Sequence, residues 1–346
     1  LFKVKGKHSY VGGPAYYMER GLKKRWMGVL FAVLITVTFG LAFNSVQSNT
    51  MSAALQSAFS IEPLNSGIVI SVLTLVIIFG GVHRIAAISS VIVPVMAVGY
   101  IALALFVVLA NIDRIPAVVE QIVGNAFGWH QAVGGGIGTA LMQGIKRGLF
   151  SNEAGMGSAP NAAATAHVTH PAKQGFIQAL GVFTDTLLIC SCTAFIILFG
   201  EDYIGSGLDG IQLTQAALTS EVGNIGGIYV AIATLFFAYS SILGNYYYGE
   251  ANIRFFTSRQ WPVVLYRMLV GGMVLFGSLA SLNLVWNLAD VTMALMSICN
   301  LIAIFLLGKY AFRLLDDYLA QKRKGIKSPV FHKEQMKDIE QDLECW

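Results

Sequence analysis

The chain has 346 residues, of which 55% are hydrophobic and only 12% are charged. Soluble globular proteins carry about 25% charged residues, so the composition excludes a soluble domain and indicates a polytopic membrane protein. The formal net charge of +4 at pH 7 is small and implies no nucleic-acid partner. The four cysteines lack the paired pattern of a disulfide framework.

Apolar runs alternate with short polar stretches along most of the chain. A run of about 20 apolar residues is long enough to cross the hydrocarbon core of a bilayer. The predicted spans are Trp26–Phe43, with a helical continuation to about Phe59, Leu64–Gly80, Ile88–Asn111, Phe176–Phe199, Ile228–Tyr248, Val263–Leu282 and Val285–Gly308. With a broken helix at 134–168, they make eight membrane segments in a transmembrane core at 26–308.

Basic residues are concentrated in alternate loops. They lie in a basic loop at 1–25, in the loops 81–87, 169–175 and 250–260, and in a charged tail at 309–346. The opposite loops carry only Arg114. By the positive-inside rule both ends of the chain are cytoplasmic, which predicts a multi-pass protein of the plasma (inner) membrane. The alternating charges of the tail predict a solvated helix beside the membrane.

The stretch QGIKRGLFSNEAGMGSAP, residues 143–160, interrupts an apolar helix with glycines, a polar Ser-Asn-Glu triplet and Pro160. Irregular backbone at membrane depth is tolerated only where protein buries it or where it lines a cavity. Broken helices of this kind hold substrates and ions in secondary transporters; a glycine-rich kink for helix packing is the alternative. Lys146 and Arg147 are expected to snorkel to the interface or to pair with an acid such as Glu153.

Two further acids, Asp185 and Asp290, lie within apolar spans. Ionisable residues there serve ion pathways or pair helices, and the sequence leaves both roles open. His167 and His170 are three residues apart but lack a third ligand, so they are interpreted as loop residues and not as a metal site. No metal site other than one for sodium is predicted.

Three motifs carry a family resemblance: GLFSNEAGMGSAPNAAATA at 148–166, VGGPAYYMERGL at 11–22 and LVWNLADVTMALMSICNL at 284–301. The chain resembles the alanine/glycine:cation symporters, also called the sodium:alanine symporters, along essentially its whole length. The resemblance implies an all-α, inverted-repeat amino-acid transporter fold with discontinuous helices. Our broken helix then corresponds to core helix six, and the first two core helices are expected to lie outside this sequence, at its N-terminal side.

The same resemblance implies residue roles. Substrate contacts are expected at Gln47, Phe150, Ser151, Asn152 and Asn245, sodium ligands at Ser240 and Ser241, and support of the helix break at Glu153, Gly155 and Gly157. For Phe150 the alternative is ordinary packing, for Gln47 a hydrogen bond between helices, and for the two serines bonding within their own helix. Many family members carry Trp where this chain has Asn245. The smaller side chain of Asn245 would widen the pocket.

The implied function is sodium-coupled symport of a small neutral amino acid of the alanine and glycine class by alternating access. The alternative substrate is a larger polar neutral amino acid such as glutamine, which Asn245 would favour. The partners are the amino acid, Na⁺ as coupling ion and the bilayer, with no cofactor; the oligomeric state is left open. An ion channel is the alternative from a different functional class. The sequence shows no nucleophile paired with a base, so an enzyme is not predicted.

Overall fold

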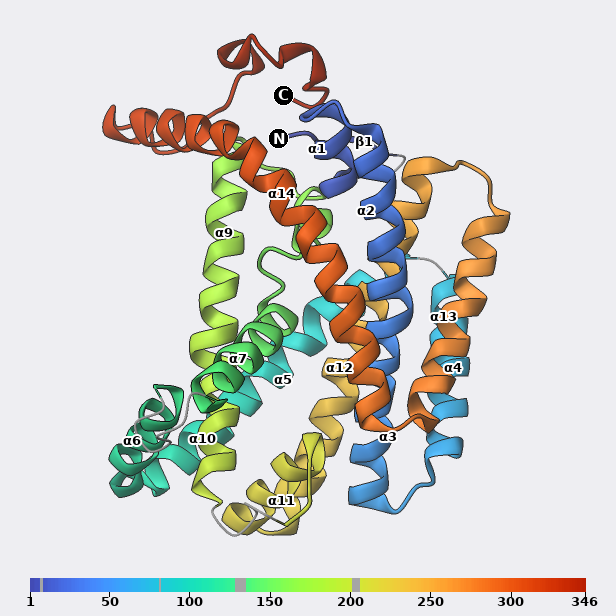
Figure 1. Ribbon diagram of the computed structural model, residues 1–346, viewed down its shortest axis with the longest axis vertical. Coiled ribbons are helices and arrows are strands. Elements are labelled where there is room, and N and C mark those ends of the chain that lie inside the picture. The colour runs from blue at the N-terminus through green and yellow to red at the C-terminus, as the bar shows by residue number, and fades with distance from the viewer. Residues whose placement is uncertain (7–8, 81, 128–134, 201–205) are drawn as a thin grey trace.

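The computed structural model describes residues 1–6, 9–80, 82–127, 135–200 and 206–346, and helices dominate it (Figure 1). Within these residues the sheet is a hairpin of β1 (Val4–Lys5) and β2 (Tyr10–Val11), paired antiparallel. Residue 81 of the second basic loop, and residue 134, where the broken helix is predicted to begin, lie outside the described residues. The all-α polytopic class is confirmed.

The helices have the following bounds. The first half of the chain forms α1 (Pro14–Arg20), α2 (Arg25–Val37), η1 (Thr38–Phe43), α3 (Asn44–Phe59), α4 (Pro63–Gly80), α5 (Val82–Ala110), η2 (Ile112–Arg114), α6 (Ile115–Ala126) and α7 (Gly135–Asn152). The second half forms α8 (Ala159–Ala163), α9 (Pro171–Phe183), η3 (Thr184–Cys190), α10 (Ser191–Phe199), α11 (Gly210–Val222), α12 (Asn224–Phe256), α13 (Trp261–Leu279), α14 (Leu282–Arg323), η5 (Lys333–Met336) and η6 (Glu340–Asp342). The segments η1 and η3 are π-helical, and η2, η5 and η6 are 3₁₀ helices.

The first predicted span and its continuation form one helix. The elements α2, η1 and α3 join into a 35-residue apolar helix, Arg25–Phe59, as the sequence predicts. The helix ends where Ser60 takes a left-handed backbone conformation, with φ of 54°. The elements α9, η3 and α10 join in the same way into the 29-residue span Pro171–Phe199. Each of these two long helices therefore contains a π-helical segment in its interior.

Six helices among the described residues are long and apolar enough to cross a membrane, or seven if one bent pair counts as a span. The six coincide with predicted runs, and the bent pair, Pro94–Ala110 with Ile112–Ala126, meets at 76° where the run Ile88–Asn111 is predicted. The broken segment, with α7 and α8, is not among the six. The total of eight membrane segments stays a prediction.

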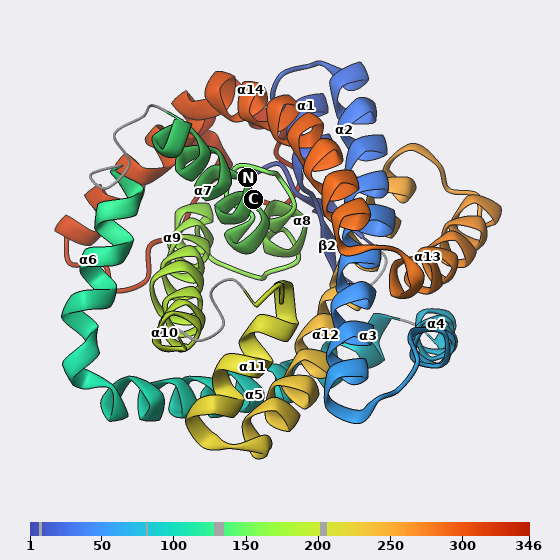
Figure 2. The same cartoon turned by 60° about the horizontal axis from the view of Figure 1, so that its bottom comes forward.

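Helix α12 packs against many of its neighbours, among them α2, α3, α5, α11 and α13. In Figure 2 it forms part of a ring with α14, α2, α5 and α6, and α7, α8 and α9 lie on the inner side of that ring. The largest apolar cluster joins α2, η1 and α14 around Phe31, Phe39 and Met296, none of which is accessible to solvent. This core fixes the helices that face the break between α7 and α8.

Large apolar side chains cover much of the outer surface. Phe305 on α14 is 86% exposed, and Ile225 on α12 is 77% exposed. Contiguous apolar surface on this scale marks an interaction with lipid or another protein. Because the exposed side chains lie on helices of membrane-spanning length, lipid is the environment that covers them.

The helix that the charges of the tail predict is present as the end of α14, but the chain after it folds back onto the protein. Helix α14 continues without a break past residue 308 to Arg323, and the chain then folds back as a strap, residues 324–346. Phe331, Met336, Ile339 and Leu343 of the strap are buried in a small apolar cluster with Phe2 and Tyr310. The strap therefore covers the end of the bundle at which both chain ends lie (Figure 1).

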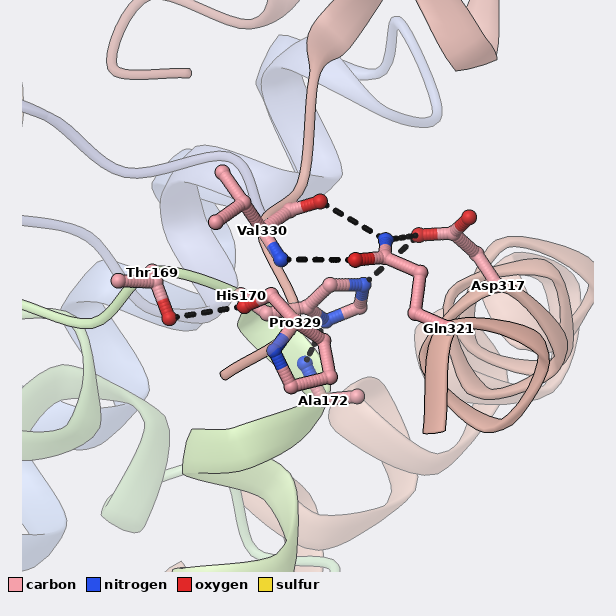
Figure 3. Close-up of polar contacts among 7 residues, drawn as sticks. All are labelled: Thr169, His170, Ala172, Asp317, Gln321, Pro329 and Val330. Carbon is pink, nitrogen blue, oxygen red and sulfur yellow. Dashed lines mark hydrogen bonds and ion pairs between the residues drawn. The ribbon is translucent and has the colours of Figure 1, made fainter. Parts of the chain in front are cut away.

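The strap also fastens the start of α9 (Figure 3). The backbone N–H of Phe331 donates to the Thr169 carbonyl at 3.0 Å, and the Thr169 hydroxyl donates to the Pro329 carbonyl at 2.9 Å. His170 is fully buried; its Nδ1 accepts from the Ala172 N–H as the N-cap of α9, and its Nε2 lies 3.0 Å from Asp317 Oδ2. His170 is thus a structural cap of α9.

Candidate functional site

The break in the predicted broken helix lies between Asn152, the last residue of α7, and Ala159, the first of α8. The predicted glycines differ in their roles. Gly155 and Gly157 have φ of 86° and 95°, which side chains other than glycine rarely adopt, and they form the break itself. Gly144 and Gly148 lie inside α7 with open space around them. The break is therefore shorter than the glycine spacing suggests.

Gly157 is also a point of close approach. A Cβ built on this residue would lie 2.8 Å from the Phe31 ring, 2.8 Å from Pro14 and 2.9 Å from the Asn300 side chain. Because α1, α2 and α14 converge on the break at this point, a larger residue would push them apart. The break is thus packed into the core rather than open on all sides.

Amide side chains that sequence reasoning missed satisfy the carbonyls of the break. Asn300 Nδ2 donates to the Gly155 carbonyl at 2.8 Å, and its Oδ1 accepts from the Tyr17 hydroxyl. Asn161 Nδ2 donates to the carbonyls of Gly157 and Ser158, both at 3.0 Å. Asn300 lies within an apolar span, and a buried polar residue in such a run is the signal that would have identified it.

Glu153 supports the break in a different way from the one predicted. It has a left-handed φ of 56°, and its carboxylate accepts a hydrogen bond from Ser158 Oγ at 2.5 Å, which closes the turn. Lys146 and Arg147 do pair with an acid, as expected, but that acid is not Glu153. Those two cations bind Asp290 of α14, at 3.3 Å and 2.5 Å. They lie in the preceding turns of α7, which face α14, so Asp290 is the acid within their reach.

Phe150 belongs to a row of aromatic rings that crosses the centre of the molecule. Its ring centroid lies 4.6 Å from that of Phe43 on η1 and 4.6 Å from that of Trp286 on α14. The row continues from Phe43 to Phe39 at 4.6 Å and from Phe39 to Tyr248 of α12 at 5.3 Å. Phe150 itself is half-buried, so one face of this row remains accessible.

Two of the predicted substrate residues lie beside this row. Asn245 is buried on α12, and its Nδ2 donates to Asn44 Oδ1 at 3.1 Å, next to Phe43. Gln47 is half-buried on α3, one turn after Phe43 and hence on the same helix face. Among the described residues, none forms a hydrogen bond with the Gln47 side chain. The alternative role of Gln47, a hydrogen bond between helices, therefore has no partner among them.

The predicted sodium ligands bond within their own helix. Ser240 Oγ and Ser241 Oγ both donate to the Phe237 carbonyl, at 2.8 Å and 3.0 Å. Bonding within the helix is the alternative role that was left open for these two serines. In these bonds the hydroxyls act as donors, so their oxygens are not used as acceptors. Each hydroxyl oxygen keeps its lone pairs for another donor or for a cation.

The remaining two substrate residues, Ser151 and Asn152, face η3. Ser151 Oγ donates to Asp185 Oδ2 at 2.6 Å, and Asn152 Nδ2 donates to Thr186 Oγ1 at 3.1 Å. Ser151 thus contacts η3, whereas Phe150, its neighbour in sequence, contacts η1 and α14. The end of α7 is held by η1 and η3 together.

A cavity of about 850 Å³ begins at the break and extends toward the strap. Asn152, Glu153, Gly155 and Gly157 of the predicted site line it, as does Asn300. Gln47, Phe150 and Asn245 lie outside its wall, in or beside the aromatic row; Ser151 faces η3, and Ser240 and Ser241 lie further along α12. The structure therefore divides the predicted residues among this cavity, the aromatic row, η3 and α12.

Comparisons with known proteins identify the family. A family model described as the sodium:alanine symporter family matches residues 1–333. The chain is 55% identical over 346 residues to the probable sodium/glutamine symporter GlnT of Bacillus subtilis, covering 100% of this chain and 72% of that protein. It is 52% identical to the amino-acid carrier protein AlsT of Bacillus subtilis, covering 100% of this chain and 74% of that protein.

A more distant relative is the sodium/alanine symporter AgcS of Methanococcus maripaludis, which is 38% identical over 305 residues, covering 86% of this chain and 67% of that protein. The extent of these matches confirms the resemblance carried by the three motifs. The chain, with its apolar helices and its broken helix at the centre, therefore belongs to the sodium:alanine symporter family of membrane transporters.

Proposed function

We propose that this protein carries a neutral amino acid across the plasma membrane together with Na⁺, by alternating access and with both ends of the chain in the cytoplasm. The observation that carries the proposal is the broken helix, in which Phe150 near the end of α7 belongs to the aromatic row while Glu153, Gly155 and Gly157 of the unwound stretch line a large cavity. Unwound backbone beside a cavity at membrane depth is where transporters bind substrates and ions.

The amino acid occupies the region where α7 ends, with its side chain against Phe150, Gln47 and Asn245. Contiguity supports this placement, because the Phe150 ring packs against Phe43, Asn44 follows Phe43 and pairs with Asn245, and Gln47 lies one turn further on. Ser151 and Asn152 supply polar groups at the same helix end. A half-buried aromatic face with a few convergent polar groups is typical of small-molecule sites.

The coupling ion binds at Ser240 and Ser241 through their hydroxyl lone pairs. Oxygen ligands suit a hard cation, and the hydroxyl protons are already directed to the Phe237 carbonyl. Na⁺ bound to α12 stabilises the conformation that binds the amino acid, so each ligand raises the affinity for the other.

The substrate is a small neutral amino acid, alanine or glycine, and glutamine is the second candidate. The relatives named above include one for glutamine and one for alanine. The observation that favours glutamine is the amide pair of Asn245 and Asn44, which places polar groups beside the aromatic row. A larger polar side chain would find a donor and an acceptor there.

The test is uptake of labelled alanine and labelled glutamine into proteoliposomes, with an inward gradient of Na⁺ or of choline. We expect uptake only with Na⁺, and we expect Phe150→Ala to reduce it by about tenfold, which corresponds to about 1.4 kcal/mol. Phe305→Ala, which removes a lipid-facing ring from α14, is the matched control and should change uptake less than about twofold. Uptake at the same rate with a Na⁺ gradient and with a choline gradient would refute the symport mechanism.

A further inference from the structure

Asp185 is an acid in the interior of an apolar span. It belongs to η3, within the helix Pro171–Phe199, in which a window of 18 residues has a mean hydropathy of 2.1. The sequence leaves open whether Asp185 and Asp290 serve an ion pathway or pair helices. A carboxylate in such a segment is expensive to maintain and marks a functional site by default. Its surroundings decide between the two roles.

The two acids have different partners. Asp290 is bound by Lys146 and Arg147, and Glu250 of α12 is bound by Arg254 and Arg267, so both of these carboxylates pair helices or turns through cations. Among the described residues no Lys, Arg or His forms an ion pair with Asp185; its contacts are the Ser151 hydroxyl at 2.6 Å and the Cys190 thiol at 3.9 Å. Its negative charge is therefore not compensated by the described protein.

The contacts of Asp185 join two irregular pieces of backbone. Two consecutive residues at the end of α7, Ser151 and Asn152, bond to Asp185 and Thr186, two residues of η3. π-Helical segments inside α-helices occur frequently at functional sites. The end of α7 thus meets η3 through the side-chain oxygens of Asp185 and Thr186 and through the Cys190 thiol, whose Sγ lies 3.1 Å from Ser151 Oγ.

The oxygens available at this junction suit a hard monovalent cation. The carboxylate of Asp185 has one oxygen, Oδ1, that accepts no hydrogen bond from the described residues, and the hydroxyls of Ser151 and Thr186 retain lone pairs. Carboxylate and hydroxyl oxygens are hard ligands, which favours Na⁺ over softer ions. Asp185 is half-buried, and both Asn152 and Val182, one turn before Asp185, line the cavity, so an ion has a route to it.

We propose that Asp185, Ser151 and Thr186 form a second Na⁺ site, between the end of α7 and η3 and separate from the serine pair of α12. The proposal rests on the proposed function, because it assigns this ion to the same transport cycle. A cation here neutralises the charge of Asp185 and binds the end of α7 to η3. Occupancy of the site therefore favours one position of the helix end that carries Phe150, which links the ion to the substrate region.

The test is equilibrium binding of radiolabelled Na⁺ to the purified transporter in detergent, without amino acid. We expect Asp185→Asn to raise the apparent Kd of one bound ion at least about tenfold, or about 1.4 kcal/mol, and Ser151→Ala to raise it by a smaller factor. Asp185→Glu, which keeps the charge, should retain part of the binding. Asp113→Asn, which removes a charge from η2 outside this region, is the matched control.

The outcomes separate the two proposals. Unchanged Na⁺ binding in Asp185→Asn overturns the second site, even if wild-type uptake depends on Na⁺. If the wild type instead takes up no amino acid under a Na⁺ gradient, the proposed function fails, and the binding measurement still decides whether the site exists. Unchanged Na⁺ binding with a lost pH dependence of uptake would assign a proton to Asp185 and likewise overturn it. Should Asp185→Asn fail to elute as a monodisperse peak, Ser151→Ala and Asp185→Glu provide the same comparison.

Discussion

The two π-helical segments of the described chain hold the same helix end by opposite chemistry. Five of the six η1 residues are buried, among them Phe39, Ala42 and Phe43, and the Phe43 ring packs against Phe150. None of the η3 residues is buried among the described residues, and its Asp185 accepts from Ser151. Aromatic stacking does not depend on ions in solution, whereas a contact to an uncompensated carboxylate does. The end of α7 is therefore anchored on η1 and adjustable on η3.

The largest expected effect comes from removing the anchor. Phe39→Ala on η1 deletes a ring with no exposed surface. We expect a loss of about 3–5 kcal/mol in stability, because the neighbouring side chains cannot fill the space that the ring leaves. Thermal unfolding of the purified protein measures this loss. Phe305→Ala serves again as the exposed control, with an expected loss below about 0.5 kcal/mol; similar losses in the two variants would show that η1 is no anchor.

Double-mutant cycles sharpen the comparison at the two contacts themselves. For Phe43 and Phe150, each changed to Ala, we expect a coupling energy of about 0.5–1.5 kcal/mol that is the same with and without Na⁺. For Ser151→Ala and Asp185→Asn, we expect a coupling energy that changes when Na⁺ is replaced by choline, since the ion binds both side chains. The readout is the free energy of unfolding at matched ionic strength. Equal responses of the two cycles to Na⁺ would contradict the division into anchored and adjustable sides.

The smallest expected effect lies far from both segments, in the strap. Hydrogen bonds from Arg313 hold the pKa of Asp338 below its usual value of 3.8. Because the pKa is lower in the folded state, this contact stabilises the strap at pH values above 3.8 and is lost as the pH falls through the folded-state pKa. Hydrogen–deuterium exchange of residues 333–343 should rise at acid pH in the wild type. In Arg313→Gln, exchange should be higher at neutral pH and should change less on acidification.

The sequence predicts the long helices and the break well, because both depend on local composition. Apolar runs locate the spans, and Gly155, Gly157 and Pro160 place the end of α7 within a few residues. Composition carries no comparable signal for the π-helical segments. Thr38–Phe43 and Thr184–Cys190 read as continuous helix, and only the packing around them determines where the wider turns occur.

The partners of charged residues are harder to predict, since they depend on which helices meet. Arg147 and Asp290 are 143 residues apart, whereas Glu153, the partner suggested by proximity in sequence, turns back to Ser158. The same limit applies to Asp185 and Asp290. Both are acids in apolar runs, and only the structure separates the one with two cationic partners from the one with none among the described residues.

The contact between His170 and Asp317 constrains the order in which the chain assembles. The two residues are separated by 147 positions, and the buried ring of His170 has Asp317, Tyr318 and Phe331 around it in the finished structure. At roughly 5–20 residues per second, synthesis of the intervening chain takes on the order of 7–30 seconds. Throughout that interval His170 has been synthesised but the residues that cover it have not. Closing this end of the molecule therefore has to wait until the chain has been synthesised at least as far as Phe331.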